Sequence, residues 1–94
     1  MKKVLTIAGS DSCGGAGIQA DLKAMSAMGV YGMSVITAVT VQNTMGVFGV
    51  QEISTDIVEG QIKAIFEDIE VDSVKVGMLS SSELIRTIGA ALKK

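Results

Sequence analysis

The 94-residue sequence contains no histidine, no proline and no tryptophan, and it contains only one cysteine. Without histidine the chain cannot build a Ser-His-Asp triad, a His–Cys nucleophile pair or an HExxH zinc site from its own residues. A single cysteine can form neither an internal disulfide nor a cysteine-rich zinc site, and this is typical of a reducing compartment. The sequence therefore predicts no metal site within these residues.

Charged and aromatic residues are also scarce. Eight Lys and Arg residues against ten Asp and Glu residues give a net charge of −2, and aromatic residues make up 3% of the chain. Such a chain lacks the basic surface and the stacking rings that nucleic acids require. The longest apolar run, residues 35–41, is far shorter than the roughly 20 residues of a membrane helix. The apolar run at residues 4–8 is too short for a signal peptide. We expect a globular cytoplasmic protein that binds neither nucleic acid nor membrane.

Hydrophobic periodicity predicts strands that alternate with helices. Nearly continuous apolar runs are typical of strands buried on both faces, and apolar residues spaced three and four apart are typical of helices. A Ser80–Glu83 capping box indicates the start of the last helix. The expected strands are residues 3–8, 30–43, 47–53 and 74–79, and the expected helices are residues 18–28, 54–69 and 80–92, with Gly29 ending the first.

This alternation is typical of an α/β protein with a parallel sheet. No Asp, Glu, Lys or Arg occurs between Ala24 and Gln51, and so long an uncharged run suits the centre of a covered sheet. Covering both faces of a parallel sheet requires helices on each side. Because three or four strands with three helices make a thin sandwich, we expect residues 1–94 to be the first part of a larger domain.

The segment GSDSCGGAG lies between a predicted strand and a predicted helix, where free amides and the helix dipole favour an anion. Gly9 and Gly14 have the spacing of a Walker A loop, but Gly15 replaces the lysine. Gly15, Gly17 and Ala20 match a dinucleotide fingerprint, but the strand ends too early and no acidic residue follows at the required distance. Both nucleotide motifs are excluded. A turn whose glycines permit positive φ and close packing remains open beside an anion site.

The run GSDSCGGAGIQADLKAMSAMGVYGMSVITAVTVQNT and the later VKVGML resemble the N-terminal part of hydroxymethylpyrimidine/phosphomethylpyrimidine kinases. These are thiamine-biosynthesis enzymes of the ribokinase-like superfamily. The resemblance extends nearly end to end and includes three separated motifs at compatible spacing. It implies a three-layer α/β sandwich, of which residues 1–94 would be the N-terminal, substrate-side third.

The resemblance also implies a pyrimidine site made from four residues. Gly9 would bring backbone close to the substrate, and Asp21 would lie near the substrate hydroxymethyl group. Gln42 would read the aminopyrimidine edge with its donor and its acceptor, and Met78 would supply an adaptable apolar wall. All except Asp21 fall at carboxyl ends of predicted parallel strands, where α/β sheets bind ligands.

Other interpretations of these residues stay open when they are taken alone. Gln42 could belong to a turn that leaves a strand, and Asp21 could be a first-turn acid stabilised by the helix dipole. Met78 could be a core methionine. Cys13 lies at a helix N-terminus, where a thiolate is favoured. The catalytic cysteine of the family belongs to a much later segment, so Cys13 is predicted to have no role.

In the family, ATP with Mg²⁺ phosphorylates the hydroxymethyl oxygen and then the phosphomethyl product. The anion hole and the catalytic base lie in a C-terminal Gly-Thr-Gly-Cys-type segment, which does not occur in this sequence. The resemblance therefore implies no catalytic residue, and no complete ATP or Mg²⁺ site, within residues 1–94. We expect the chain to be inactive alone.

Two further functions remain as alternatives. The first is a pyridoxal or pyridoxine kinase, because these relatives share the fold and the hydroxymethyl chemistry. The second is a non-catalytic module that binds a pyrimidine or associates with itself. An incomplete sheet leaves an unpaired edge strand and a bare apolar face, which predicts a homo-oligomer.

Overall fold

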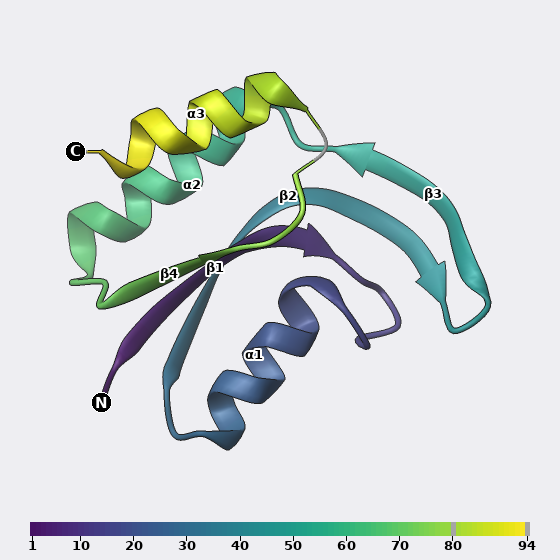
Figure 1. The fold of residues 1–94 in the computed structure, drawn as a ribbon, viewed down its shortest axis with the longest axis horizontal. Coiled ribbons are helices and arrows are strands. Elements are labelled where there is room, and N and C mark those ends of the chain that lie inside the picture. The colour runs from purple at the N-terminus through teal and green to yellow at the C-terminus, as the bar shows by residue number, and fades with distance from the viewer. Residues whose placement is uncertain (80, 94) are drawn as a thin grey trace.

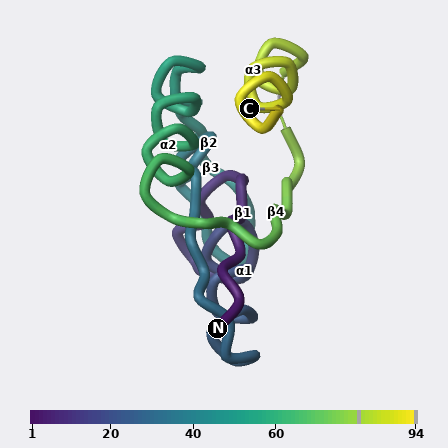
Figure 2. Tube along the Cα trace, turned by 90° about the vertical axis from the view of Figure 1, so that its left-hand side faces the viewer, coloured from purple at the N-terminus to yellow at the C-terminus, as the bar shows by residue number. Residues whose placement is uncertain are grey.

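The computed structural model describes residues 1–79 and 81–93 and shows a four-stranded sheet between helices (Figure 1). Helix α1 packs on β1 and β2 from one side, while α2 and α3 pack against each other on the other side. Figure 2 shows α2 and α3 side by side, away from α1. This is the predicted three-layer α/β arrangement. The elements are β1 (Lys3–Ser10), α1 (Gly17–Ala27), β2 (Tyr31–Asn43), β3 (Gly46–Glu52), α2 (Thr55–Asp68), β4 (Ser73–Val76) and α3 (Ser82–Leu92).

The sheet is mixed, with the strand order β3-β2-β1-β4. Strand β1 pairs in parallel with β2 and β4, as predicted. Strand β3 is antiparallel to β2, so the expectation of a purely parallel sheet was wrong at this edge. Only Thr44 and Met45 separate β2 from β3. Such a short connection can form a hairpin but cannot form a parallel crossover.

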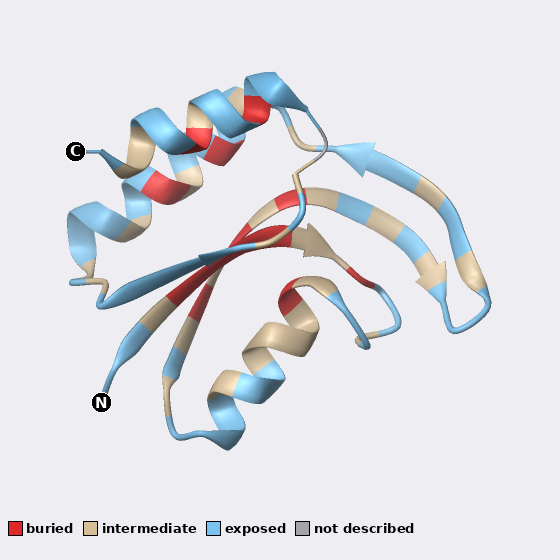
Figure 3. Cartoon of the chain, in the orientation of Figure 1, coloured by how far each residue is buried: buried red, intermediate tan, exposed pale blue. Residues whose placement is uncertain are grey.

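The core lies on the side of the sheet that α2 and α3 cover. Alternate residues of a strand face opposite sides, so Leu5 and Ile7 of β1 point to this core while Thr6 and Ala8 point towards α1. Figure 3 shows most of the buried residues in β1, the first half of β2 and the facing sides of the two helices, with others at the start of α1 and in the loop before it. The buried core residues are Leu5, Ile7, Met33, Val35, Val58, Ile62, Leu84 and Ile88.

Element ends differ from the predicted ones by up to three residues, among them those of β4 and α3. Strand β4 stops at Val76, and the Gly77 N–H donates the last backbone hydrogen bond to the Ile7 carbonyl. Helix α3 is capped by Ser81, whose Oγ accepts from the Leu84 N–H at 3.1 Å. Ser80, the predicted cap, lies outside the described residues. Glu83 lies in the first turn of α3, where its negative charge interacts favourably with the helix dipole. It does not form a capping box with Ser81.

The hairpin of β2 and β3 extends beyond the helices (Figure 1). Its outer part carries no Asp, Glu, Lys or Arg until Glu52. It exposes apolar side chains, which are Val39, Val41, Met45, Val47, Phe48 and Val50. None of the helices in residues 1–79 and 81–93 has the length and apolar character needed to cross a membrane.

Candidate functional site

An open hollow of about 410 Å³ lies at the carboxyl ends of β1, β2 and β4. Gly9, Gln42 and Met78 all line it, so the structure brings together three of the four residues singled out in the sequence. The glycine-rich loop between β1 and α1 forms one side, and Lys75 and Gly77 contribute from β4 and its end. The hollow lies at the strand ends, which is where α/β sheets bind ligands.

Gly9 stands at an irregularity in the sheet. Along the ladder with β2, Ala8 pairs with Ile36 and Ser10 pairs with Val39, so the register shifts at Gly9. An extra residue in one strand bends the backbone and redirects the neighbouring groups. The extra residue lies in β2, where Thr37 and Ala38 stand opposite Gly9, so the ladder is interrupted where it reaches the hollow.

Gln42 stands at a second irregularity, because the ladder between β2 and β3 shifts register between Val41 and Gln42. The backbone of Gln42 is held by Ser12 of the glycine-rich loop. The Ser12 hydroxyl donates to the Gln42 carbonyl at 2.7 Å and accepts from the Gln42 N–H at 2.9 Å. The Gln42 side-chain oxygen lies 3.1 Å from the Thr40 hydroxyl, which also donates to the Ser10 carbonyl at 2.6 Å. Gln42 is thus tied to both neighbouring segments and is not a free turn residue.

Met78 lies at the edge of the hollow and is 96% exposed. The interpretation of Met78 as a core methionine is therefore wrong. An unbranched, flexible side chain in this position can adjust to a ligand that enters the hollow.

Asp21 does not line the hollow. Its two carboxylate oxygens accept from the Lys75 ammonium at 2.9 and 3.1 Å, and Oδ2 also accepts from the Thr6 hydroxyl at 2.6 Å. Burial acts to raise the pKa of Asp21, but the hydrogen bonds from Thr6 and Lys75 and the Lys75 charge outweigh it, and the pKa is lowered. No acidic residue lies in the first turn of α1, so the helix-dipole interpretation of Asp21 was also wrong.

Lys75 is a site residue that the sequence analysis missed. It lines the hollow and stands between Val74 and Val76 in a four-residue strand. The sequence did contain a signal for this residue, namely a lysine within an apolar strand, because such a charge requires either solvent or a partner of opposite charge.

The glycine-rich loop is organised around Asp11, whose side chain is buried. Its Oδ1 accepts from the Cys13 N–H at 2.9 Å, and its Oδ2 accepts from the N–H groups of Gly15 and Ala16 at 3.0 and 2.8 Å. An internal carboxylate therefore uses the amides that an external anion would need. Gly14 has a φ of 87°, as expected for a turn built on glycine. Cys13 is exposed and does not line the hollow.

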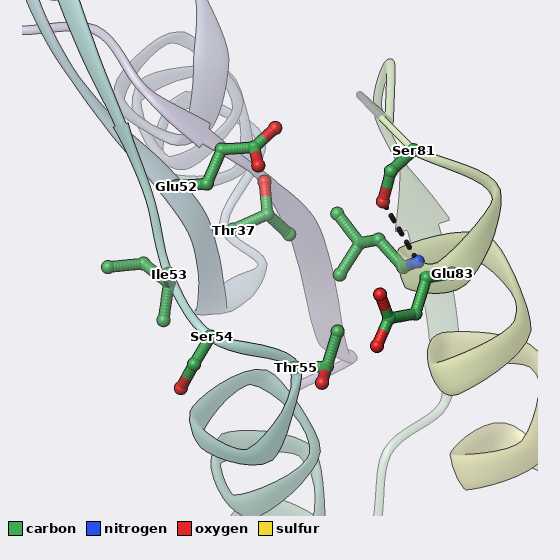
Figure 4. Close-up of a pocket in the computed structure, with 8 residues that line it drawn as sticks. Thr37, Glu52, Ile53, Ser54, Thr55, Ser81 and Glu83 are labelled. Carbon is green, nitrogen blue, oxygen red and sulfur yellow. Dashed lines mark hydrogen bonds between the residues drawn. The ribbon is translucent and has the colours of Figure 1, made fainter.

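A second hollow, of about 300 Å³, opens on the other side of the sheet, between the first turns of α2 and α3 (Figure 4). Figure 4 shows hydroxyl and carboxylate side chains around it, among them Thr55, Ser81 and Glu83. None of the four residues singled out in the sequence lines this hollow.

The fold, with its hollow at the strand ends, is of the ribokinase-like class. The chain superimposes on the crystal structure of a phosphomethylpyrimidine kinase from Clostridium difficile 630, with a TM-score of 0.95 and 60% identity, over 99% of this chain and 40% of that one. It also superimposes on a pyridoxal kinase from Staphylococcus aureus in complex with AMP-PCP and pyridoxal, with a TM-score of 0.87 and 38% identity, over 99% of this chain and 35% of that one.

The family model for phosphomethylpyrimidine kinase matches residues 11–94, and the chain belongs to this family. A hydroxymethylpyrimidine/phosphomethylpyrimidine kinase from Rhizobium meliloti (strain 1021) is 58% identical over 90 residues, which are 96% of this chain and 34% of that protein. The chain thus spans about a third of the length of the curated relative.

Proposed function

We propose that the protein containing this chain is an ATP-dependent hydroxymethylpyrimidine/phosphomethylpyrimidine kinase of thiamine biosynthesis. It would transfer one phosphoryl group to the hydroxymethyl oxygen and a second to the phosphomethyl product. The observation that carries this proposal is the meeting of Gly9, Gln42 and Met78 at one hollow, in a chain that belongs to the family.

In this proposal the hollow binds the pyrimidine, and residues 1–94 are the substrate-side part of one kinase domain. Gly9 offers backbone that no side chain covers, and Gln42 offers an amide donor and acceptor to the aminopyrimidine edge. The exposed side chain of Met78 covers one face of the ring. Asp21 belongs to the site indirectly, through its ion pair with Lys75, which lines the hollow.

ATP with Mg²⁺ is the phosphoryl donor that we propose for the whole protein. The resemblance implies no complete site for either group within residues 1–94. The loop amides are used by Asp11, and no group of three or more His, Cys, Asp or Glu side chains in residues 1–79 and 81–93 is placed to hold a metal ion. We therefore expect these 94 residues to bind pyrimidine without turnover.

Calorimetry with hydroxymethylpyrimidine tests the binding part of the proposal. A Gln42→Ala substitution should weaken binding by about tenfold, because the ring would lose at least one paired hydrogen bond. A Gln51→Ala substitution on the exposed face of β3 is the matched control and should leave the affinity unchanged. Equal affinities of the parent and the Gln42→Ala variant would refute the assignment.

A coupled assay of ADP release tests the catalytic part. The 94-residue chain, with hydroxymethylpyrimidine and MgATP, should release ADP no faster than its Gln42→Ala variant. Turnover above that control would show that these residues hold a complete active site.

A pyridoxal kinase is the second candidate, because a solved pyridoxal kinase shares the fold at 38% identity. Tighter binding of pyridoxal or pyridoxine than of hydroxymethylpyrimidine would favour it. The higher identity to pyrimidine kinases supports the first proposal. Pyrimidine binding by the whole protein that contains this chain, without any phosphorylated product in the presence of MgATP, would instead favour a non-catalytic module.

We also propose that the protein forms a homo-oligomer. The hairpin exposes apolar side chains, including Val41, Phe48 and Val50, at the β3 edge of the sheet. An unpaired edge strand with an apolar surface favours pairing with a second chain.

A further inference from the structure

Among the described residues that line the hollow at the strand ends, Lys75 is the one with a cationic side chain. Its Cα lies opposite that of Thr6 in the parallel ladder of β4 and β1. Because side chains alternate along a strand, Lys75 and Thr6 project from the same face of the sheet, towards α1. The register therefore places an ammonium and a hydroxyl next to Asp21.

The carboxylate of Asp21 is fully engaged by these two neighbours. Both oxygens accept from Lys75, and Oδ2 accepts in addition from Thr6, which is completely buried. The Asp21 side chain is 20% exposed, whereas that of Lys75 is 53% exposed. A ligand in the hollow would therefore meet Lys75, with Asp21 lying behind it.

The Lys75 ammonium has hydrogen-bonding capacity that the protein does not use. It carries three N–H donors, and among the described residues its hydrogen-bond acceptors are the two carboxylate oxygens of Asp21. The remaining donor lies on a half-exposed side chain at the wall of the hollow. An ionised Asp21 balances the lysine charge, so this donor can bind a neutral hydroxyl and, more strongly, a phosphate oxygen.

We propose that Lys75 binds the oxygen-bearing substituent of the pyrimidine ligand, as the alcohol or as its phosphate ester, and that Asp21 is a positioning residue that acts only through Lys75. The inference rests on the proposed function, because it assumes that the pyrimidine occupies this hollow. It assigns to Lys75 the contact with the substituent that distinguishes the two substrates.

Calorimetry of the purified protein with hydroxymethylpyrimidine and with phosphomethylpyrimidine tests the role of Lys75. A Lys75→Met substitution should weaken binding of the phosphate ester by about tenfold or more, as expected for the loss of a charge-assisted hydrogen bond, and binding of the alcohol by about threefold. The ratio of the two dissociation constants should change accordingly. The matched control is Lys63→Met on α2, whose side chain lies outside this hollow, and it should leave both affinities unchanged.

An unchanged ratio in Lys75→Met, with both ligands still bound by the parent protein, would overturn the inference and leave the proposed function standing. Binding of neither ligand by the parent would overturn both. If circular dichroism shows that Lys75→Met is unfolded, the same measurement on Lys75→Gln decides the question. Lys75→Arg, which keeps the charge, should retain the ratio within about threefold.

A double-variant experiment tests the positioning role of Asp21. Asp21→Asn leaves the Lys75 charge unbalanced, so it should change the ratio in favour of the phosphate ester by about threefold or more. In the Lys75→Met background the same substitution should not change the ratio. A change of the ratio in that background would show that Asp21 contacts the ligand directly. A purely structural role would weaken both ligands equally and leave the ratio at its parent value, and this also would contradict the proposal.

Discussion

Gly17 holds the start of α1 directly against the carbonyl oxygen of Gly9, at the end of β1. Gly17 has a φ of 60°, and a Cβ atom at this position would collide with the Gly9 oxygen and lie 3.2 Å from the Asp11 nitrogen. A glycine avoids both the collision and the cost of a left-handed backbone. The wall of the hollow therefore depends on the absence of a side chain at residue 17.

A Gly17→Ala substitution should lower the free energy of unfolding by about 1–3 kcal/mol, because it adds backbone strain and a collision. Gly60→Ala is the matched control. Gly60 lies within α2 with open space around its Cα, so alanine there should raise the free energy of unfolding by about 0.5–1 kcal/mol. Urea denaturation of both variants measures these values. Equal effects of the two substitutions would contradict the proposed contact.

The Ser12 hydroxyl should protect the end of β2. A Ser12→Ala substitution removes both hydrogen bonds to the Gln42 backbone, so it should cost about 1 kcal/mol of stability. It should also speed hydrogen exchange at the Gln42 amide, measured by NMR. Ser26→Ala on the exposed side of α1 is the control. Unchanged exchange at Gln42 in the Ser12 variant would show that the loop does not hold the strand end.

The hydrogen bonds and the ion pair of Asp21 should make the free energy of unfolding depend on pH. The folded-state pKa of Asp21 is lowered, so its ionised form stabilises the fold above the unfolded pKa of about 3.9, and this contribution is lost as the pH falls through the lower folded value. Asp21→Asn should therefore lower the free energy of unfolding at pH 7 by about 1–2 kcal/mol, since the partner lysine is half exposed.

The difference between the parent and Asp21→Asn should shrink as the pH falls below about 4. Chemical denaturation at pH 3, 4, 5 and 7 measures it. Glu70→Gln, an exposed carboxylate beyond α2, should show no comparable difference at pH 7. A difference for Asp21→Asn that stays constant down to pH 3 would contradict the ion pair.

The exposed hairpin should govern self-association. Light scattering of the parent protein should give a dimer or a higher oligomer, and Val50→Lys on β3 should shift it towards the monomer, because a charge at an apolar edge opposes strand pairing. Ile57→Lys, at an equally exposed apolar position on α2, should leave the oligomer intact. A monomeric parent protein would refute the proposal of a homo-oligomer.

The elements that could be predicted from the sequence are those with local signals. The apolar run of β2 correctly predicted a strand. Gly29, which has a φ of 73°, correctly predicted the end of α1. The antiparallel direction of β3 could also have been predicted, because a connection as short as the one between β2 and β3 permits a hairpin and not a parallel crossover. The family resemblance gave Gly9, Gln42 and Met78, and the parallel topology predicted that the strand ends meet; the structure brings these three residues to one hollow.

The partners of Asp21 could not be predicted in the same way. Lys75 is 54 positions away in the chain, and only the register of β4 against β1 makes the two side chains neighbours. A local pattern contains no information on such a register. The burial of Asp11 was similarly hidden, because its three amide partners depend on the detailed turn of the loop.

The hydrogen bonds from the loop amides to the Asp11 carboxylate hold the glycine-rich loop beside the hollow. Because a side chain of the protein already completes the hydrogen bonding of the loop, the loop holds its shape before any ligand arrives. Association then avoids the entropy cost of ordering a mobile segment, a cost that would otherwise be subtracted from the affinity. A carboxylate of the protein itself thus pre-organises the rim of the hollow.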